Sequence, residues 1–454
     1  MTEVKKTRIS KETYKRALKI ALPAIIETFF MTFVGLIDSL MVSSISSYAV
    51  AAVGLTAQPK FIGLALFMAL GVSTSAIVAR RYGENRKKDA NATLMTSLVF
   101  ALIAGVIMSL IFVFGADTII RLCGSSENTH NDAVEYLQII MGGMLFNCIQ
   151  ITINAAQRGA GNTKITMTTN VTSNLVNVVF NYLLIGGHFG FPALGIKGAA
   201  IATVLGTVVS SIMSICSLLK KDIFVSFIYV VKEKIRPTIE AFKVIIRFGY
   251  SIFFEQILLR IGFAATAIMA ANMGDDSMAA HQVAMNVMGI CFSFGDGLQT
   301  AAVALIGKSL GEQLYDKAKE YGKACQSLGA IISVVLSVSL FLLAKPLMTL
   351  FFPDKPHIVE IGVSIMRLQI IIVLFQVSTV IYMGCLRGAG DNLYTATMCA
   401  TSVTVIRTVV SYICGYTLGL GIMGVWLGVL ADQVTRFFAG AIRFKQGKWV
   451  KIKI

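Results

Sequence analysis

About twelve apolar stretches, each long enough to cross a lipid bilayer, follow one another along this 454-residue chain. Hydrophobic residues make up 56% of the chain and charged residues 14%, and the mean hydropathy is +0.74, which is outside the range of soluble domains of this length. The sequence therefore predicts an all-α integral membrane protein. The expected spans are residues 17–43, 49–79, 92–115, 131–157, 163–186, 195–219, 240–273, 278–307, 320–344, 358–386, 393–418 and 422–444.

The second half of the chain repeats the first. The motif Arg158-Gly159-Ala160-Gly161 returns 229 positions later as Arg387-Gly388-Ala389-Gly390. Each copy holds six spans, and an even number makes both copies enter the membrane in the same direction. We therefore expect two six-helix lobes related by a pseudo-two-fold axis along the membrane normal, with a binding cavity between them. Further repeated pairs at nearly the same spacing are Glu27 and Glu255, Gly83-Glu84 and Gly311-Glu312, and Gly195-x-x-Gly198 and Gly421-x-x-Gly424.

The distribution of Lys and Arg predicts the orientation, because cytoplasmic loops retain basic residues. With the N-terminus in the cytoplasm, 31 of the 40 basic residues fall on the inner side, four on the outer side and five inside spans. The net charge of +16 then marks topology and contact with anionic lipid, not binding of nucleic acid. We expect a multi-pass protein of the plasma or inner membrane with both termini cytoplasmic. The expected parts are a cytoplasmic basic tail (1–16), an N-lobe (17–219), a cytoplasmic inter-lobe loop (220–239), a C-lobe (240–444) and a cytoplasmic tail (445–454).

Motifs of enzymes and cofactor sites receive no support. The eight cysteines show no C-x-x-C spacing and lie mostly in apolar helices, where they act as small buried hydrophobes. Gly419-x-Gly421-x-x-Gly424 matches the dinucleotide fingerprint, but it follows a membrane helix where that fingerprint requires a strand. No zinc motif or nucleophile elbow is present. We expect a protein that is not an enzyme and has no cofactor or resident metal.

The first span carries two carboxylates, and ionisable groups inside lipid indicate function because they are costly there. Glu27 and Asp38 are eleven residues apart, which places both on one face of a helix, roughly 16 Å from each other. That face must look toward a water-accessible cavity or a partner helix. Asp38 is the strongest candidate for an ion-coupling residue. The alternative for each acid is a buried carboxyl group whose hydrogen bonds are satisfied.

Amide side chains form stripes on two neighbouring spans. Asn170, Asn174, Asn177 and Asn181 follow i, i+4, i+7, i+11 spacing, and residues 147, 150, 154 and 157 form a similar row of Asn and Gln. Amides donate and accept without a net charge, so such stripes suit a wet cavity or a cation site, or they join helix to helix. Asn177 and Asn181 reach the depth of Asp38, so we assign all three to ion coupling. The candidates for the substrate cavity are Glu27, Asn154, Asn170, Asn174, Glu255, Gln282 and Asp296.

The second lobe is not a chemical copy of the first. Thr266 stands where the repeat would place Asp38, and Arg407 falls within a residue of the equivalent of Asn177. An arginine at that position mimics a permanently bound cation, which predicts an ion switch in the first lobe only. Asp296 and Glu255 could attract a cationic substrate or pair with arginines. The roles of Arg260, Arg367 and Arg407 are left open.

Taken in order, these motifs resemble the multidrug and toxic compound extrusion (MATE) family. The resemblance rests on both Arg-Gly-Ala-Gly steps, both Gly-Glu loops, Val34-x-x-Ile37-Asp38, Phe254-Glu255 and Ala280-His281-Gln282. It implies a secondary transporter of twelve helices that exports amphipathic, often cationic compounds in exchange for protons or sodium. Asp38 matches the family's coupling aspartate, and Asn177 matches its asparagine on the fifth helix. We expect small amphipathic organic cations and the lipid bilayer as partners, and a monomer.

Two departures from the family pattern bear on the coupling ion. Proton-coupled relatives often carry a second acid one turn beyond the asparagine, where this chain has Asn181. Sodium-coupled relatives carry an aspartate shortly after a Phe-Gln pair, whereas Phe375-Gln376 is followed by Val377, Ser378 and Thr379. Coupling through Asp38 is favoured, and a proton is favoured over sodium. If the ion is sodium, Asp38 and Asn177 are its candidate ligands.

Two other function classes are weighed against transport of drugs. A flippase of lipid-linked oligosaccharides shares this broad architecture but needs a strongly basic cavity, whereas the candidates in the first lobe are acids and amides. An intramembrane hydrolase using paired acids has no need for two six-span repeats, and Glu27 and Asp38 are too far apart to share one water.

Overall fold

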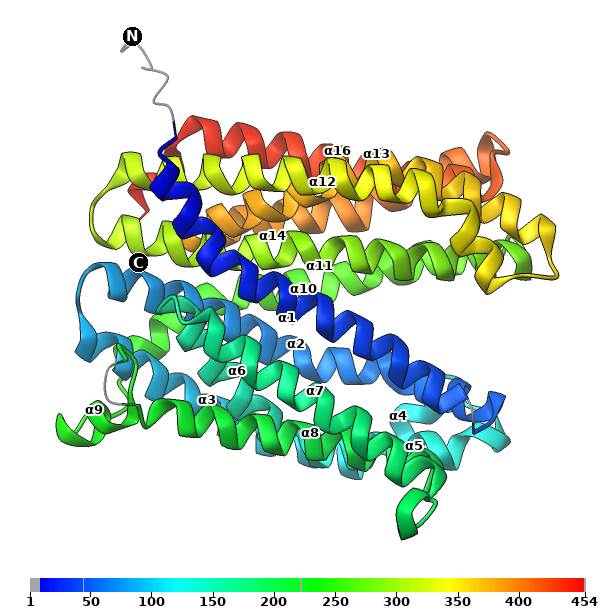
Figure 1. Ribbon diagram of the computed structural model, residues 1–454, viewed down its shortest axis with the longest axis horizontal. Helices are drawn as coiled ribbons and strands as arrows, with labels where there is room; N and C mark the ends of the chain where they lie inside the picture. The colour runs from blue at the N-terminus through cyan, green and yellow to red at the C-terminus, as the bar shows by residue number, and fades with distance from the viewer. Residues whose placement is uncertain (1–8, 44, 221–222, 453–454) are drawn as a thin grey trace. The chain divides into compact units, whose positions relative to one another are not determined.

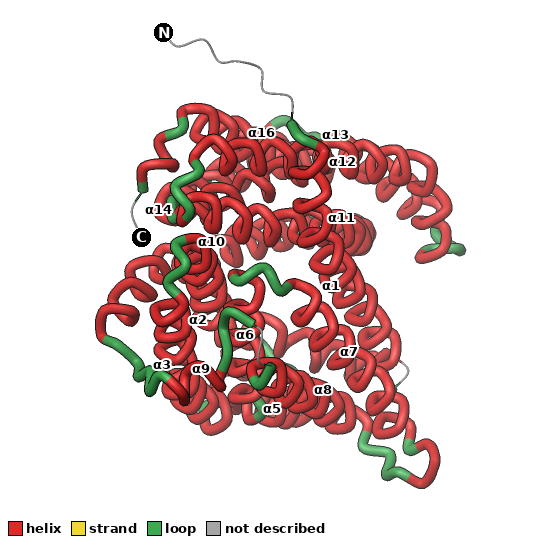
Figure 2. Tube along the Cα trace, turned by 60° about the vertical axis from the view of Figure 1, so that its left-hand side comes forward, coloured by secondary structure: helices red, strands yellow, loops and turns green. Residues whose placement is uncertain are grey.

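The computed structural model describes residues 9–43, 45–220 and 223–452. Within these ranges the backbone is almost entirely helical and contains no strand (Figures 1 and 2). The predicted all-α fold is confirmed. Residues 1–8 of the expected N-terminal tail, 44, 221–222 of the inter-lobe loop and 453–454 of the C-terminal tail lie outside the described residues.

Every predicted span corresponds to a helix or to consecutive helical segments. In chain order these are α1 (Lys11–Ser43), α2 (Ser47–Gly83), α3 (Lys87–Phe114), α5 (Glu127–Gly142) with α6 (Met144–Gly159), α7 (Thr163–Gly186), α8 (Gly195–Leu218), α10 (Ile239–Ala271), α11 (Asp275–Gly311), α12 (Tyr315–Phe351), α13 (Pro356–Ala389), α14 (Asn392–Ala400) with η2 (Thr401–Arg407), α15 (Thr408–Tyr412) and η3 (Ile413–Thr417), and α16 (Gly421–Gln446). Short helical segments between or after them are α4 (Ala116–Leu122), η1 (His188–Gly190), α9 (Phe227–Lys232) and η4 (Lys448–Lys451).

Among the described residues, ten helices are long and apolar enough to cross a membrane, and the bent pair α5 and α6 makes an eleventh span. These two helices meet at Gly143 with a bend of 47°. A side chain at Gly143 would lie 2.7 Å from Val204, so this position accepts only glycine without rearrangement. The remaining predicted span, α7, is 24 residues long but less apolar, because it carries the stripe of four asparagines.

The chain folds into two compact units, which divide inside helices. The C-unit comprises Met1–Ile25 and Phe254–Ile454, and the N-unit comprises Ile26–Phe253. The first part of α1 therefore belongs to the C-unit and its remainder to the N-unit, while α10 is divided after Phe253. The lobe limits expected from the sequence, 17–219 and 240–444, stay a prediction.

Specific contacts hold the first part of α1 in the C-unit and the first part of α10 in the N-unit. In the C-unit, the hydroxyl of Thr13 donates to Glu320 on α12 at 2.7 Å. A Cβ on Gly297 of α11 would lie 2.6 Å from the backbone nitrogen of Ile25. In the N-unit, Phe242 of α10 packs edge-on against Phe100 of α3 with ring centroids 5.6 Å apart. Each helix segment is thus part of the core in which it lies.

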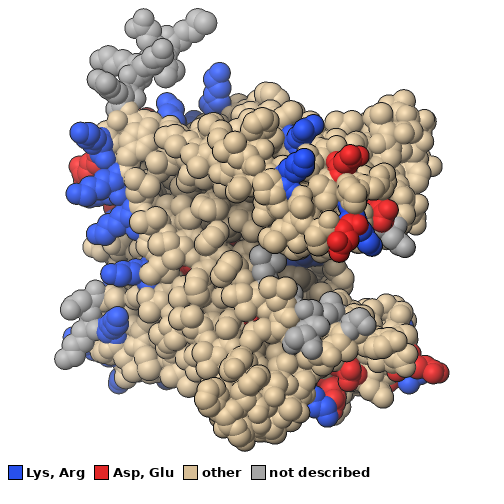
Figure 3. Space-filling model, turned by 45° about the vertical axis from the view of Figure 1, so that its right-hand side comes forward, with Lys and Arg blue, Asp and Glu red and all other residues tan. Residues whose placement is uncertain are grey.

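Charged side chains are few on the surface. On the face shown in Figure 3, Lys and Arg side chains gather on the left, and most of the visible Asp and Glu side chains lie on the right. Which end is cytoplasmic stays a prediction.

The two Arg-Gly-Ala-Gly motifs perform the same structural task in their units. The first glycine of each motif packs against the backbone of the second helix of its repeat: Gly159 against the carbonyl of Ser75, and Gly388 against that of Val303. The last glycine of each motif has a positive φ, 83° at Gly161 and 90° at Gly390, which a side chain disfavours. The repeat in the sequence therefore reflects a close helix crossing followed by a left-handed turn.

The close crossing predicts that alanine substitutions at two different glycines change the stability of the protein in opposite directions. Gly388→Ala would place Cβ 2.8 Å from the carbonyl oxygen of Val303, and this overpacking should cost about 1–3 kcal/mol. Gly289→Ala on α11 has no atom within 4 Å of the new Cβ and should gain about 1 kcal/mol of helix propensity. We expect a lower midpoint of thermal unfolding for the first variant in detergent and an unchanged or higher one for the second. Equal midpoints would contradict the packing argument.

Candidate functional site

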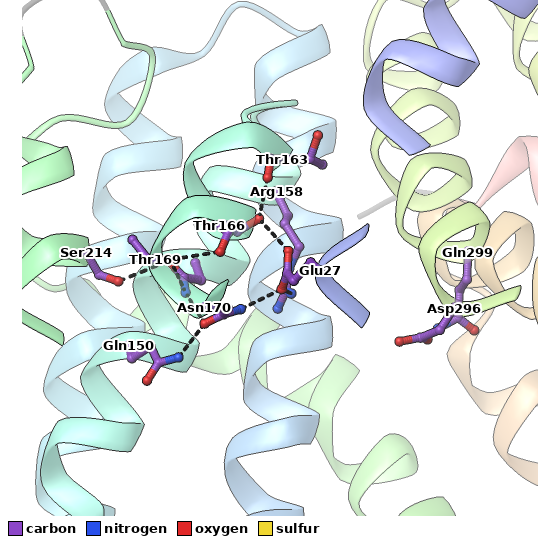
Figure 4. A network of polar contacts seen from close by, with 11 residues as sticks. Glu27, Gln150, Arg158, Thr163, Thr166, Thr169, Asn170, Ser214, Asp296 and Gln299 are labelled. Carbon is purple, nitrogen blue, oxygen red and sulfur yellow. Dashed lines mark hydrogen bonds and ion pairs between the residues drawn. The ribbon is translucent and has the colours of Figure 1, made fainter. Parts of the chain in front are cut away.

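Glu27 lies at the centre of a polar network in the N-unit (Figure 4). Its side chain is 2% exposed. One carboxylate oxygen accepts from Asn170 of α7 and faces Nη1 of Arg158 at 3.3 Å, and the other accepts from the hydroxyl of Thr166 at 3.1 Å. Three partners satisfy this buried carboxylate. The position corresponds to the alternative of an acid with satisfied hydrogen bonds, and a role of Glu27 in the substrate cavity stays a prediction.

The amide stripes of α6 and α7 meet next to Glu27. Asn170 Oδ1 accepts from the amide nitrogens of both Gln150 and Asn154 of α6. Asn154 also donates to Thr169 at 3.1 Å and accepts from Ser214 of α8 at 3.1 Å. The inner half of the predicted stripe therefore joins three helices of the N-unit.

The C-unit contains the counterpart of this network. Arg387 of the second Arg-Gly-Ala-Gly motif pairs with Glu255, whose side chain is 1% exposed. Arg387 also donates to Gln299 at 3.5 Å, and Gln299 donates to Asp296 at 2.8 Å. The arginine of each motif thus pairs with the glutamate of its own repeat.

Asp38 is held by two amides that lie one turn apart on α7. Asn181 Nδ2 donates to Asp38 Oδ1 at 2.7 Å. The amide of Asn177 lies between Asp38 and Thr203 of α8. With its nitrogen toward Asp38 it donates to both carboxylate oxygens at 2.9 Å and accepts from the hydroxyl and backbone N–H of Thr203 at 3.2 Å. The structure therefore brings the three predicted coupling residues together.

Only the nitrogen of the Asn181 side-chain amide has a hydrogen-bond partner among the described residues. Its side chain is 1% exposed, and its oxygen has no hydrogen-bond partner within the part of the chain that the structure describes. A buried amide oxygen without a donor is a ready ligand for a cation or a water molecule. It lies on the same side chain that donates to Asp38. The cluster can thus offer both a carboxylate and an amide oxygen to an ion.

Two further residues are electrostatic neighbours of Asp38, and the sequence did not single them out. Lys60 of α2 and the buried Tyr136 of α5 lie within the range of a Coulomb interaction with its carboxylate, without a hydrogen bond to it among the described residues. Lys60 could have been found, because it is one of the five basic residues that fall inside spans. Nothing in the local sequence distinguishes Tyr136 from a core tyrosine. The surroundings of Asp38 therefore come from α1, α2, α5 and α7.

Arg407 occupies the corresponding region of the C-unit and is fully buried. It donates to Asp432 of α16 at 2.7 Å, and Arg436 binds the same carboxylate through two bonds of 2.7 and 2.8 Å. Arg407 ends a π-helical segment, η2, and a second one, η3, follows it. Its partner is thus Asp432, which the sequence reading missed although a carboxylate four residues before an arginine in an apolar helix is a visible signal.

The remaining candidates are more dispersed. Asn174 is half-buried between the two clusters on α7, Gln282 is exposed, and Asp296 is half-buried. Arg260 is half-buried and Arg367 is exposed. Within the described ranges no group of three or more His, Cys, Asp or Glu could hold a metal ion. Within the N-unit, the geometry joins Asp38, Asn177 and Asn181 in one cluster and Glu27, Asn154 and Asn170 in another.

Comparison with known proteins agrees with this arrangement of long helices around buried polar clusters. The family model MatE matches residues 23–183 and 251–413. The chain is 28% identical over 446 residues to the "Probable multidrug resistance protein NorM" of Thermotoga maritima, covering 97% of this chain and 94% of the relative. It is 26% identical over 431 residues to the "Uncharacterized transporter YisQ" of Bacillus subtilis, covering 94% and 93%.

Solved structures show the same fold. The fold superposes with a TM-score of 0.89 on an "Outward-facing conformation of a multidrug resistance MATE family transporter", at 24% identity and over 96% of this chain and 97% of the other. A "MOP superfamily transporter from Pyrococcus furiosus" gives a TM-score of 0.87 with the same identity and coverage. Fold and polar clusters define a polytopic membrane transporter. The family match covers well over half of the chain, which therefore belongs to the MATE family.

The paired arginines predict a large cost for breaking one pair. Arg387→Met would leave Glu255 buried without its cation, which should destabilise the protein by about 3–5 kcal/mol. The double variant Glu255→Gln with Arg387→Met removes both charges and should recover most of that loss. Thermal unfolding of purified protein measures both. Arg121→Met is the matched control, because its pair with Asp117 is exposed to solvent and should contribute little to stability. A double variant as unstable as the single one would contradict the ion pair.

Proposed function

We propose that the chain is a secondary active multidrug efflux transporter, which exports amphipathic, often cationic compounds by alternating access in antiport with protons or sodium. Asp38 is the proposed coupling residue. The observation that carries this proposal is the cluster in which Asn177 and Asn181 donate to an intramembrane carboxylate. Within the described residues, neutral amides and no arginine bind this intramembrane carboxylate. It can therefore take up a proton or a cation without leaving an arginine unpaired.

The geometry supports a switch in which ion and drug compete for Asp38. As a carboxylate, Asp38 accepts hydrogen bonds and attracts a cationic substrate. When it is protonated or captures an ion, it loses that attraction, and the drug leaves. Return of the lobes by rocking carries the ion inward, and one charge that moves through 100 mV supplies about 2.3 kcal/mol.

The Asn177 amide fits both states of this switch. With its nitrogen toward the carboxylate it donates to Asp38 and accepts from Thr203. In the reverse orientation its nitrogen donates to the hydroxyl of Thr203 at 3.2 Å, and its oxygen faces Asp38. That oxygen can accept a hydrogen bond from a protonated carboxyl group or coordinate a cation. We propose that loading of Asp38 is accompanied by a rotation of the Asn177 amide.

A proton is the proposed coupling ion, since residues 377–379 lack the aspartate that sodium-coupled relatives carry after the Phe-Gln pair. If sodium is used instead, Asp38, Asn177 and the free oxygen of Asn181 are the candidate ligands. We further propose a monomer of the plasma or inner membrane with both termini cytoplasmic. Transport of an oligosaccharide pyrophosphate is disfavoured, because the polar clusters of the N-unit are built from carboxylates and amides and not from the basic residues that such a substrate needs.

The proposal predicts that Asp38→Asn abolishes ion-driven export. The variant keeps the shape of the side chain but can neither bind a proton nor attract a cation. In proteoliposomes we expect at least tenfold slower accumulation of ethidium under a pH gradient in sodium-free buffer, with the same loss under a sodium gradient if sodium couples. Asp117→Asn, an exposed acid of α4, is the control and should transport normally. Ion-driven transport that persists in Asp38→Asn would contradict the assignment of Asp38 as the coupling residue.

A further inference from the structure

The segment 223–238, which leads from α8 to α10, is bound to α3 of the N-unit. The buried side chain of Asn91 donates to the backbone carbonyl of Phe224 at 3.0 Å and accepts from the backbone N–H of Ser226 at 2.9 Å. Five residues further along α3, Thr96 accepts from the backbone N–H at the end of the segment, at 3.1 Å. These bonds hold the segment beside the first turns of a helix that is apolar enough to cross a membrane (Figure 1). The segment therefore lies at one end of a membrane span.

The short helix α9 inside this segment has one packed face and one exposed face. Its Val230 is buried and packs against Ala92 of α3. On the other side Phe227, Ile228 and Val231 are 43%, 40% and 61% exposed. Their i, i+1, i+4 spacing places these three side chains within a sector of about 100°, which we call the apolar face. Such a face at the end of a span fits the boundary between lipid headgroups and acyl chains.

Basic side chains lie at the end of α9 and directly after it. Lys232, Lys234 and Arg236, which we call the basic group, are exposed, and none of them pairs with a carboxylate among the residues that the structure describes. Glu233 is the only acid of residues 227–238, so three positive charges stand against one negative charge. The segment thus combines an exposed apolar face with an uncompensated positive charge.

An anionic lipid satisfies both parts of this surface. A neutral lipid covers the apolar face but leaves the basic group without a counter-charge. A soluble anion neutralises the basic group but leaves the apolar face in water. Phosphate oxygens of a headgroup accept charge-assisted hydrogen bonds from Lys and Arg, while the acyl chains of the same molecule cover the apolar side chains. The bilayer also adjoins the segment already, because α3 enters it there.

We propose that the segment 223–238 is a docking surface for anionic phospholipids. The apolar face enters the acyl boundary, and the basic group binds the phosphate of the headgroup. The surface fixes the link between the two repeats to the membrane beside the N-unit. We expect this link in the cytoplasm, and the cytoplasmic leaflet is the one whose surface is negatively charged. The proposal does not depend on the coupling role of Asp38.

The test places a fluorescent probe on the apolar face. Phe227→Trp is reconstituted in phosphatidylcholine vesicles in which an equal fraction of the lipid is either brominated phosphatidylglycerol or brominated phosphatidylcholine. Bromine on the acyl chains quenches a tryptophan that it contacts. The two native tryptophans, Trp426 and Trp449, are fully buried and supply a constant background that the unsubstituted protein measures. We expect quenching by both lipids, with an association constant at least about fivefold higher for phosphatidylglycerol.

The variants identify the groups that cause this preference. Replacing all three members of the basic group by Gln in the Phe227→Trp protein should bring the ratio of association constants close to one, while quenching persists. Raising the salt concentration should lower the ratio in the same direction, because salt screens exposed charges. Ile331→Trp is the matched control. Ile331 is 63% exposed on the spanning helix α12, far along the chain from any basic side chain, so both lipids should quench it equally.

Each other result would overturn the proposal. Equal quenching of Phe227→Trp by the two lipids would remove the preference for anionic lipid. Absence of quenching by either lipid would show that α9 does not touch the bilayer. A preference that remains after the three Gln substitutions would contradict the role of the basic group. These measurements need no transport, so they separate this proposal from the antiport proposal.

Discussion

An ion pair between an arginine and a buried glutamate anchors each repeat of this structure. Arg158 meets Glu27 in the N-unit, and Arg387 meets Glu255 in the C-unit. Each pair joins the first helix of its repeat to the end of the fourth, where the following glycine lets two helix backbones approach closely. Unpaired charges are strongly disfavoured in such surroundings, so each arginine fixes the position of its glutamate and of the helix that carries it. The polar clusters further along α1 and α7 are placed by this anchor.

The two repeats share these arginine–glutamate pairs, but they differ in the polar residues around Asn177 and Arg407. Gly206 of α8 lies beside Asn177, and a Cβ on that glycine would lie 3.3 Å from the Cβ of Asn177. In the C-unit the corresponding positions hold Arg407 and Asp432, which form a salt bridge. The N-unit therefore contains a neutral amide beside a glycine, and the C-unit contains a buried carboxylate shared by Arg407 and Arg436. The two repeats thus share their helix packing and differ in their buried polar residues.

The sequence predicted the helices well because apolar stretches of spanning length are a direct consequence of the lipid solvent. It also predicted that Asn177 and Asn181 reach Asp38, since helical spacing fixes relative depth. It could not reveal Tyr136, because a tyrosine facing a site and one in a core look the same along the chain. The division of α1 after Ile25 and of α10 after Phe253 was equally hidden, since packing partners and not local propensity decide it.

The contrast between the units gives a physical reason why an ion switch belongs in the N-unit. Arg407 and Arg436 both donate charge-assisted hydrogen bonds to Asp432, so adding a proton to that carboxylate would leave two buried arginines without their partner. Asp38 is held by amides, and an amide can present either its nitrogen or its oxygen. Asn177 finds a partner in Thr203 in both orientations. A site of this kind can change the charge of its carboxylate without breaking the helix packing around it, and this is the property that coupling requires.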